Sequence, residues 1–432
     1  MKSFIQYTSL FLLGFFMMAG SAFAQFDREM QYYTNPDQTG LNQFEAPFET
    51  DVEFDGLNVR IGGANTLQFQ GIRHDNNATD QNEIPALSEL ESNFNLATSN
   101  LDLDVALGDG LRMHLRTYLT SQHHTEAYVK SGYMQVDRLD FIQEGLLSGL
   151  MDKVRIKVGH MELNYGDNHF RRTDNAFAIH NPFVGNYIMD SFTTEVAGEV
   201  YYYNKGLLAM VGLSNGKLNQ SVVASDIKTH GTVYGKLGYE KKMGDVIHLR
   251  LTGSILNVSN SPSIYLYSGD RAGSRYYSVM DDGFRSGRFA PSFTPPRGAD
   301  PAAGEMTAIM INPFVKFQGL EFYGVYENTS GKIKDGVDDT RTFNQYGAEL
   351  LYRFGANDDF YLGGRYNLVD GESVSGDIEI DRFNIGGGWF LTKNVLAKLE
   401  YVKQTYDGDG FAGTKYDGGE FDGVMLEAVI SF

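Results

Sequence analysis

The amino-acid sequence predicts an all-β fold, a transmembrane antiparallel β-barrel of about 16 strands with short periplasmic turns and long extracellular loops. Three observations lead to this prediction. The chain begins with an export signal, and no apolar run of ~18 residues follows that signal, so no helix is expected to span a bilayer. Many later segments alternate apolar and polar residues over about 9 to 11 positions, which is the pattern of a strand with one face toward lipid.

Composition and charge exclude several other classes of protein. The chain of 432 residues contains no cysteine, which excludes disulfide scaffolds, iron–sulfur clusters and lipoproteins. A hydrophobic fraction of 42% is too low for a helical membrane protein and too high for a disordered chain. The net charge of −19 argues against nucleic-acid binding, because phosphates attract a basic surface.

The first element is a signal peptide at residues 1–24. A basic start at Lys2 precedes an apolar core, and Ala22-Phe23-Ala24 supplies the pattern of small residues at which such peptides are cleaved. The alternative, a retained membrane anchor, is less favoured because the apolar stretch is short. Residues 25–56 follow as a polar N-terminal arm with no recognisable period, and the barrel is expected over residues 57–432.

The strands are predicted from residues that alternate between two faces. Residues 111–119 show this most clearly, since Leu111, Met113 and Leu115 lie on one face and Arg112, His114 and Arg116 on the other. The expected strands are 57–70, 94–107, 111–121, 127–138, 153–163, 193–203, 206–213, 230–242, 245–257, 305–317, 319–328, 341–354, 359–369, 378–391, 394–406 and 421–432.

The connections predict how the barrel is oriented. Those after most even-numbered strands are tight, whereas those after odd-numbered strands are mostly long and rich in Asp, Gly, Asn, Ser and Pro. This rhythm places both termini in the periplasm. Residues 139–152 are an exception, because their apolar residues indicate a short helix on the periplasmic side. A soluble β-sandwich is disfavoured, since ordering so many long polar loops is costly in entropy.

Two segments fit the strand pattern poorly. Pro313 lies inside an expected strand, where it removes a ladder donor and predicts a bulge or a shifted register. Residues 206–213 alternate only weakly, because apolar residues occupy almost every position.

One region carries a more specific pattern, made of Val154 to Tyr165, Asp174-Asn175, Asn181-Pro182-Phe183, Glu195 to Tyr203 and Gly212 to Gly216. It resembles the phosphate-selective porin O and P type family of bacterial outer-membrane porins. The resemblance covers about sixty residues, while the rest of the mature chain, with its terminal Phe432, resembles outer-membrane porins only in architecture. The family implies a passive channel, usually trimeric, whose third external loop folds into the lumen as a constriction. The inward positions here mix acidic and basic residues, so they depart from the basic rows of the phosphate-specific members.

The same reasoning names candidate pore residues. The third external loop is expected at residues 164–192, and its acidic groups opposite basic wall groups would create a transverse field that orders polar solutes. The alternative is that these charges are only the wet lining of a water-filled channel. The expected lining and constriction residues are Arg112, Arg116, Arg155, Lys157, Asp167, Arg171, Arg172, Asp174 and Asp190.

The expected function is therefore passive diffusion of small polar solutes or ions across the bacterial outer membrane. A substrate-selective channel for anions or oligosaccharides, and a structural barrel whose loops bind a partner, stay open as alternatives. The HExxH motif does not occur, and no pair of acids suited to catalysis is recognised, so no enzyme is expected. Expected partners are outer-membrane lipid, lipopolysaccharide, the solutes and two further copies in a homotrimer.

Acidic loops raise the question of a metal ion. No cofactor is expected, except that Asp281-Asp282, Asp335 to Asp339 and Asp407 to Gly410 gather the oxygen ligands that Ca²⁺ prefers. None of the three has a complete calcium-loop spacing. The role of the long segment 258–304 is also left open, as a lid, a trimer contact or a partner surface.

Overall fold

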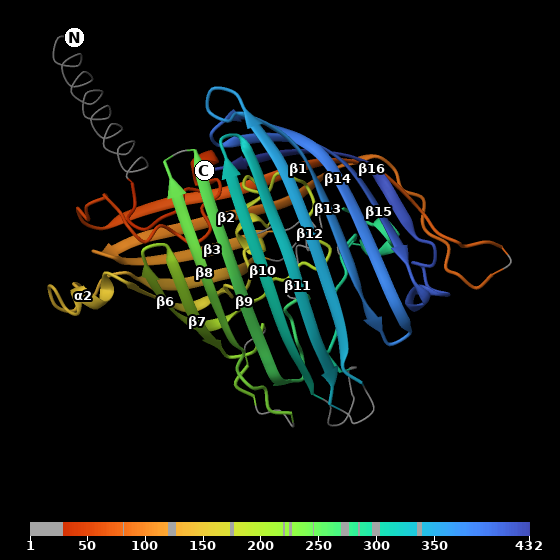
Figure 1. The fold of residues 1–432 in the computed structure, drawn as a ribbon, viewed down its shortest axis with the longest axis horizontal. Helices are drawn as coiled ribbons and strands as arrows, with labels where there is room; N and C mark the ends of the chain where they lie inside the picture. Colours follow the sequence, from red (N-terminus) through yellow and green to blue (C-terminus); the bar gives the residue numbers. More distant parts are fainter. Residues whose placement is uncertain are drawn as a thin grey trace, which may run out of the picture.

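Sixteen antiparallel strands close into a barrel (Figure 1). Each strand pairs with its neighbours in sequence and β1 pairs with β16, so the sheet has no open edge. The predicted all-β antiparallel barrel of about 16 strands is thereby confirmed. This computed structural model describes residues 29–80, 82–119, 127–172, 177–218, 221–223, 227–244, 246–268, 276–283, 286–295, 303–334 and 339–432.

Every strand lies within a few residues of its predicted position. The strands are β1 (Asn58–Asp75), β2 (Asn93–Gly108), β3 (Leu111–Leu119), β4 (Ala127–Val136), β5 (Val154–Glu162), β6 (Thr194–Asn204), β7 (Leu207–Ser214), β8 (Val233–Met243), β9 (Ile247–Ser261), β10 (Gly304–Phe317), β11 (Leu320–Ile333), β12 (Arg341–Phe354), β13 (Phe360–Ser373), β14 (Gly376–Thr392), β15 (Val395–Asp407) and β16 (Glu420–Ser431).

The helical segments are short. A single turn of α-helix, α2 (Ser148–Met151), lies in the connection between β4 and β5, as the apolar residues there predicted. The described part of the chain also has four 3-10 turns, which are η1 (Gln38–Gly40), η3 (Asn168–Arg171), η5 (Val279–Asp281) and η7 (Asp409–Phe411). Among the described residues, no helix has the length and apolar character needed to cross a bilayer.

The last residue of the chain adds to the pairing of β1 with β16 that closes the barrel. The backbone N–H of Phe432 donates to the Gly63 carbonyl at 3.0 Å, and the Gly63 N–H donates back to the Phe432 carbonyl at 3.0 Å. Glycine is required beside this contact, because a Cβ on Gly62 would lie 2.7 Å from the Phe432 oxygen. The terminal residue therefore extends the β1–β16 ladder by one step.

The two faces of the barrel differ as the alternation predicted. Large apolar side chains are exposed on the outer face, among them Leu101, Leu213 and Leu362, while polar side chains such as Gln345 and Asn384 are buried inside. Strand β7 alternates in the same way despite its weak sequence pattern. Its inward positions include Leu208 and Met210, which pack against other apolar groups inside the barrel.

Pro313 causes neither the bulge nor the shifted register that its position predicted. The register between β10 and β11 is the same before and after it, with Ile311 opposite Tyr326 and Phe314 opposite Tyr323. The side-chain amide of Asn312 donates to the Gly324 carbonyl at 3.2 Å, an acceptor on the strand facing the proline. This prediction is wrong because a neighbouring side chain supplies a donor that the proline backbone lacks.

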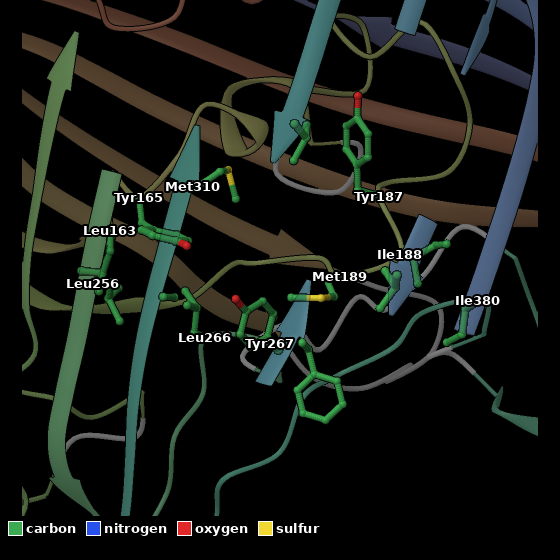
Figure 2. Close-up of a cluster of buried hydrophobic side chains, with 14 of the residues drawn as sticks. Leu163, Tyr165, Tyr187, Ile188, Met189, Leu256, Leu266, Tyr267, Met310 and Ile380 are labelled. Atoms are coloured by element: carbon green, nitrogen blue, oxygen red, sulfur yellow. The ribbon is translucent and has the colours of Figure 1, made fainter. Parts of the chain in front are cut away.

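An apolar cluster fills part of the barrel interior (Figure 2). It joins the connection between β5 and β6, through Tyr187, Ile188 and Met189, to wall residues such as Met310 and Ile380. All of these side chains are buried. The space inside the barrel is therefore partly occupied by packed chain, which limits where a solute could pass.

Candidate functional site

The connection between β5 and β6, residues 163–193, runs inside the barrel; we call it the β5–β6 loop, and it is described except for residues 173–176. At its base the Leu163 N–H donates to the Thr193 carbonyl at 3.2 Å. Further along, the Val184 N–H donates to Glu400 at 2.7 Å and the Ile188 N–H to Asn367 at 2.6 Å. The loop thus lies against inward side chains of β13 and β15.

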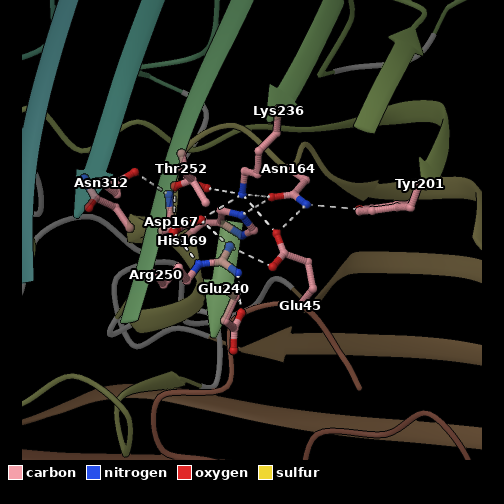
Figure 3. A network of polar contacts seen from close by, with 12 residues as sticks. Glu45, Asn164, Asp167, His169, Tyr201, Lys236, Glu240, Arg250, Thr252 and Asn312 are labelled. Carbon is pink, nitrogen blue, oxygen red and sulfur yellow. Dashed lines mark hydrogen bonds and ion pairs between the residues drawn. The ribbon is translucent and has the colours of Figure 1, made fainter. Parts of the chain in front are cut away.

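Asp167 fixes the start of this loop to β8 and β9 (Figure 3). Its carboxylate accepts hydrogen bonds from Lys236 at 3.0 Å, from two nitrogens of Arg250 at 2.9 and 3.0 Å, and from Thr252 at 2.9 Å. Burial alone would raise the pKa of Asp167, but the charges of Arg250 and Lys236 outweigh burial and hold this pKa well below its usual range. Asp167 therefore stays ionised and anchored to the wall.

Arg171 reverses the predicted arrangement of charge. It comes from the loop and contacts an acidic wall residue, Glu349, at 2.6 Å, and the same carboxylate is held by Arg365 of β13 at 2.8 Å. Asp167 matches the predicted pattern of an acidic loop against a basic wall, whereas Arg171 does the opposite. The loop and wall charges consequently neutralise one another over much of their contact.

Arg172 and Asp190 pair within the loop itself. Their two hydrogen bonds measure 2.8 and 2.6 Å, and both side chains are buried. The guanidinium carbon of Arg172 also lies 4.2 Å from the centre of the Phe192 ring. This bidentate pair joins the two limbs of the loop. Asp174, another predicted lining residue, lies outside the described residues.

The arginines predicted on β3 and β5 form ion pairs with acids of β2 and of the residue after β4. Arg112 contacts Asp104 at 2.9 Å, Arg116 contacts Asp102 at 2.7 Å, and Arg155 contacts Asp137 at 2.5 Å. The sequence indicated that acidic and basic residues mix at the inward positions, but it did not indicate which of them pair.

Lys157 is the most accessible of the predicted wall bases. Its side chain is 18% exposed, and its ammonium nitrogen lies 3.6 Å from a Glu199 oxygen and 4.5 Å from the centre of the Tyr133 ring. Its ammonium group is therefore held less tightly than the guanidinium groups of the three arginines.

A cavity of about 150 Å³ remains between the loop and the wall formed by β2 to β5. Both faces of the cavity carry charged and aromatic side chains. Its lining includes Asp102, Arg116, Lys157 and Tyr133 from the wall and His169 and Phe177 from the loop. This is the part of the interior in which a polar solute would meet the predicted wall residues.

The connection between β9 and β10, residues 262–303, also enters the barrel from the end with the long loops. Within its described residues, the Tyr276 hydroxyl donates to Glu400 at 2.7 Å and the Tyr267 hydroxyl to Glu327 at 2.7 Å. The Phe289 N–H donates to the Ile188 carbonyl of the β5–β6 loop at 2.9 Å. Sequence patterns left the role of this segment open, and the structure places it against the β5–β6 loop.

Solved structures share this fold. The anion-selective porin from Comamonas acidovorans superposes with a TM-score of 0.55 at 11% identity, over 87% of this chain and 100% of that chain. The outer membrane channel DcaP of Acinetobacter baumannii gives 0.51 at 12% identity, over 88% and 99%. In-vitro folded OmpT, an outer membrane protein of Vibrio cholerae in a trimer form, gives 0.51 at 10% identity, over 88% and 100%.

Comparison of the sequence itself adds no family. No protein-family model matches the chain, and no curated protein matches it. The likeness to solved structures therefore shows the fold, and the resemblance to the phosphate-selective porin O and P type family stays a prediction.

Proposed function

We propose that this chain is an outer-membrane porin that admits small polar solutes or ions by passive diffusion. The observation that carries this proposal is the closed barrel itself, apolar on its outer face and lined inside by polar and charged residues. Its similarity to an anion-selective porin and an outer membrane channel supports the same conclusion. The test is conductance of the purified protein in planar bilayers, and a folded barrel that never conducts would contradict the proposal.

In this proposal the β5–β6 loop is the constriction. Its anchoring by Asp167 and Arg171 presses it toward β8 to β13, so solutes would pass on the opposite side, along β2 to β5. The measurement is size exclusion by neutral polymers. Replacing Phe177, which lines the cavity, with Ala should admit larger polymers, while replacing the lipid-facing Leu362 with Ala should leave the size limit unchanged.

A substrate-selective channel for anions is the second candidate, and the composition of the cavity favours it. Arg116 lies 5.1 Å from the centre of the Phe177 ring, and Lys157 lies over Tyr133, so cationic and aromatic groups occur together. Such surfaces suit anionic solutes or sugars with exposed hydroxyls. Concentration-dependent block of single-channel currents by a solute would distinguish this candidate from an open pore. A structural, complex-forming barrel is the outcome if no conductance is found.

The remaining partners follow from the same proposal. We propose export through a cleaved signal at residues 1–24, insertion into outer-membrane lipid beneath lipopolysaccharide, and assembly as a homotrimer, the form recorded for one OmpT structure. The mass of the mature chain and native mass spectrometry test these points. Among the described residues no group of three or more His, Cys, Asp or Glu side chains could hold a metal ion. Calcium binding by the acidic loops stays a prediction, which calorimetry with Ca²⁺ can test.

A further inference from the structure

The N-terminal arm, described over residues 29–56, forms a closed loop across the end of the barrel that carries the short turns. The side chain of Gln31 donates to the Val52 carbonyl at 2.9 Å, which ties the two ends of the arm together. The same amide donates to Asp109 in the turn between β2 and β3 at 3.0 Å. The segment between Gln31 and Val52 therefore starts and ends beside the turn between β2 and β3.

From there the arm reaches the opposite wall. The Gln38 N–H donates to the Lys393 carbonyl, in the turn between β14 and β15, at 2.8 Å. Its side-chain amide donates to the Asn357 carbonyl, in the turn between β12 and β13, at 3.0 Å. The side chain of Asn42 then donates to Glu321 of β11 at 2.7 Å.

The returning half of the arm penetrates further into the barrel. Phe44 is buried, with its ring centre 5.5 Å from that of Phe314 and 4.4 Å from the guanidinium carbon of Arg250. Glu45 contacts Arg250 at 2.7 Å and Lys236 at 3.3 Å, so it joins the network that also holds Asp167 (Figure 3). The arm and the β5–β6 loop consequently share the same two wall bases.

The last part of the arm contacts two more wall residues, on β5 and β6. Arg155 of β5 donates to the Ala46 carbonyl at 2.7 Å and to the Pro47 carbonyl at 2.6 Å. The Phe48 ring stacks on Tyr203 of β6 with 4.4 Å between ring centres. The arm has thus contacted β2–β3, β14–β15, β12–β13, β11, β8–β9 and β5–β6 in turn, which is most of the circumference of the mouth.

We propose that the N-terminal arm is a displaceable plug that closes the short-turn mouth of the channel in the described conformation. This inference rests on the proposed porin function. Tyr33, Phe44 and Glu45 of the arm also line the cavity of about 150 Å³, so a solute leaving that cavity toward the short turns meets the arm. The full chain accordingly conducts only in intervals when the arm has moved aside.

The contacts of the arm are of a kind that can be broken without opening the barrel. Within the described residues, the arm shares one backbone–backbone hydrogen bond with the rest of the chain, at Gln38, and its other contacts involve side chains. The strands, by contrast, are joined by continuous ladders. The arm continues directly into β1, so it would remain tethered after release.

The test compares single-channel currents of the full chain and of a variant lacking residues 29–53. The plug predicts long closed intervals in the full chain and a several-fold higher open fraction in the variant. Equal open fractions in the full chain and the variant would contradict the plug proposal but not the proposed porin function. Absence of conductance from both folded forms overturns the plug and the porin together. Heat-modifiable mobility on gels checks that each barrel has folded.

A cross-link provides a second test if the truncated chain fails to fold. The protein has no cysteine, so Gln38→Cys with Asp358→Cys creates the only thiol pair, and the Gln38 side chain already lies 3.4 Å from the Asp358 carbonyl. A short cleavable thiol-reactive linker should abolish openings, and cleavage should restore them. The single variant Asp358→Cys with the same reagent is the control. Unchanged openings in the linked protein overturn the proposal.

Discussion

The pair formed by Arg172 and Asp190 shows how a charge inside the barrel is used for structure. Replacing Arg172 with Met should destabilise the fold by about 3 kcal/mol, because among the described residues Asp190 would stay buried with only an amide donor from Asn186 at 3.2 Å and the more distant Arg288 at 4.0 Å. Equilibrium unfolding of the refolded barrel measures this loss. Arg73→Met is the matched control, since Arg73 is 85% exposed in its pair with Asp422 and should leave stability nearly unchanged.

A loss of 1 kcal/mol or less in the Arg172 variant would contradict a structural role for the pair. The double variant Arg172→Met with Asp190→Leu sharpens the test. It removes both charges, so it should recover much of the stability that the single variant loses.

His180 links the β5–β6 loop to the N-terminal arm and makes this contact sensitive to acid. Its Nε2 lies 3.0 Å from the Asp37 carbonyl, so the neutral ring donates there, and burial lowers the pKa of His180 from 6.5 to about 4. At a pH between about 4 and 6.5, His180 binds a proton when the arm is released from it, but not when the arm is packed against it. The packed contact therefore loses stability as pH falls from about 6.5 to about 4, by at most about 3 kcal/mol.

Hydrogen exchange of residues 37–41 at pH 7 and pH 4.5 measures this effect. The protection factor, which is the intrinsic exchange rate at each pH divided by the observed rate, should fall at the lower pH in the native protein. A His180→Gln variant keeps a side-chain donor and should show a smaller pH response. His230→Gln is the control, because His230 is exposed and contacts Ser259 far from the arm. A pH response unaffected by His180→Gln would show that another group is responsible.

At the scale of single elements, Gly324 explains how a proline fits into β10. A Cβ at Gly324 would lie 2.7 Å from Cγ of Pro313, and the proline ring cannot move away easily. Gly324→Ala should therefore destabilise the barrel by about 1 to 3 kcal/mol through overpacking. Urea unfolding measures the change, and Gly253→Ala on β9 is the control because nothing lies within 4 Å of its Cβ. Equal midpoints for the two variants would contradict this account.

Strand positions could be predicted because alternation with period two is local information. Arg112, Arg116 and Arg155 were placed inward on the same basis, and all three are buried inside the barrel. The partners of Arg112 and Arg116 required the register between β2 and β3, which shifts between Ala106 and Gly108. That irregularity places Asp102 opposite Arg116, and the residues of the tight turn alone do not specify it.

The N-terminal arm could not be predicted because its partners are distant in sequence. Its apolar residues follow neither the period of a strand nor that of a helix. Its residues contact several different strands and turns. Glu45, for example, contacts Lys236 and Arg250, and Gln38 contacts Lys393. Only the closed barrel brings these groups to one mouth. The acidic and basic residues of the interior, in contrast, could be recognised from the sequence. How they pair could not, because the pairing depends on how the β5–β6 loop folds.

At the scale of the whole molecule, so many buried charges are paired that few remain to determine ion selectivity. Lys157 is the exception among the predicted wall bases, because it is 18% exposed and lies 3.6 Å from Glu199. Replacing Lys157 with Gln should shift the reversal potential in a salt gradient toward cations, since one positive charge leaves a narrow cavity of about 150 Å³. Lys403→Gln is the matched control, because Lys403 is 49% exposed and pairs with Glu420 away from the cavity. If both variants shift the potential equally, the ions do not pass along β2 to β5, and the proposed path is wrong.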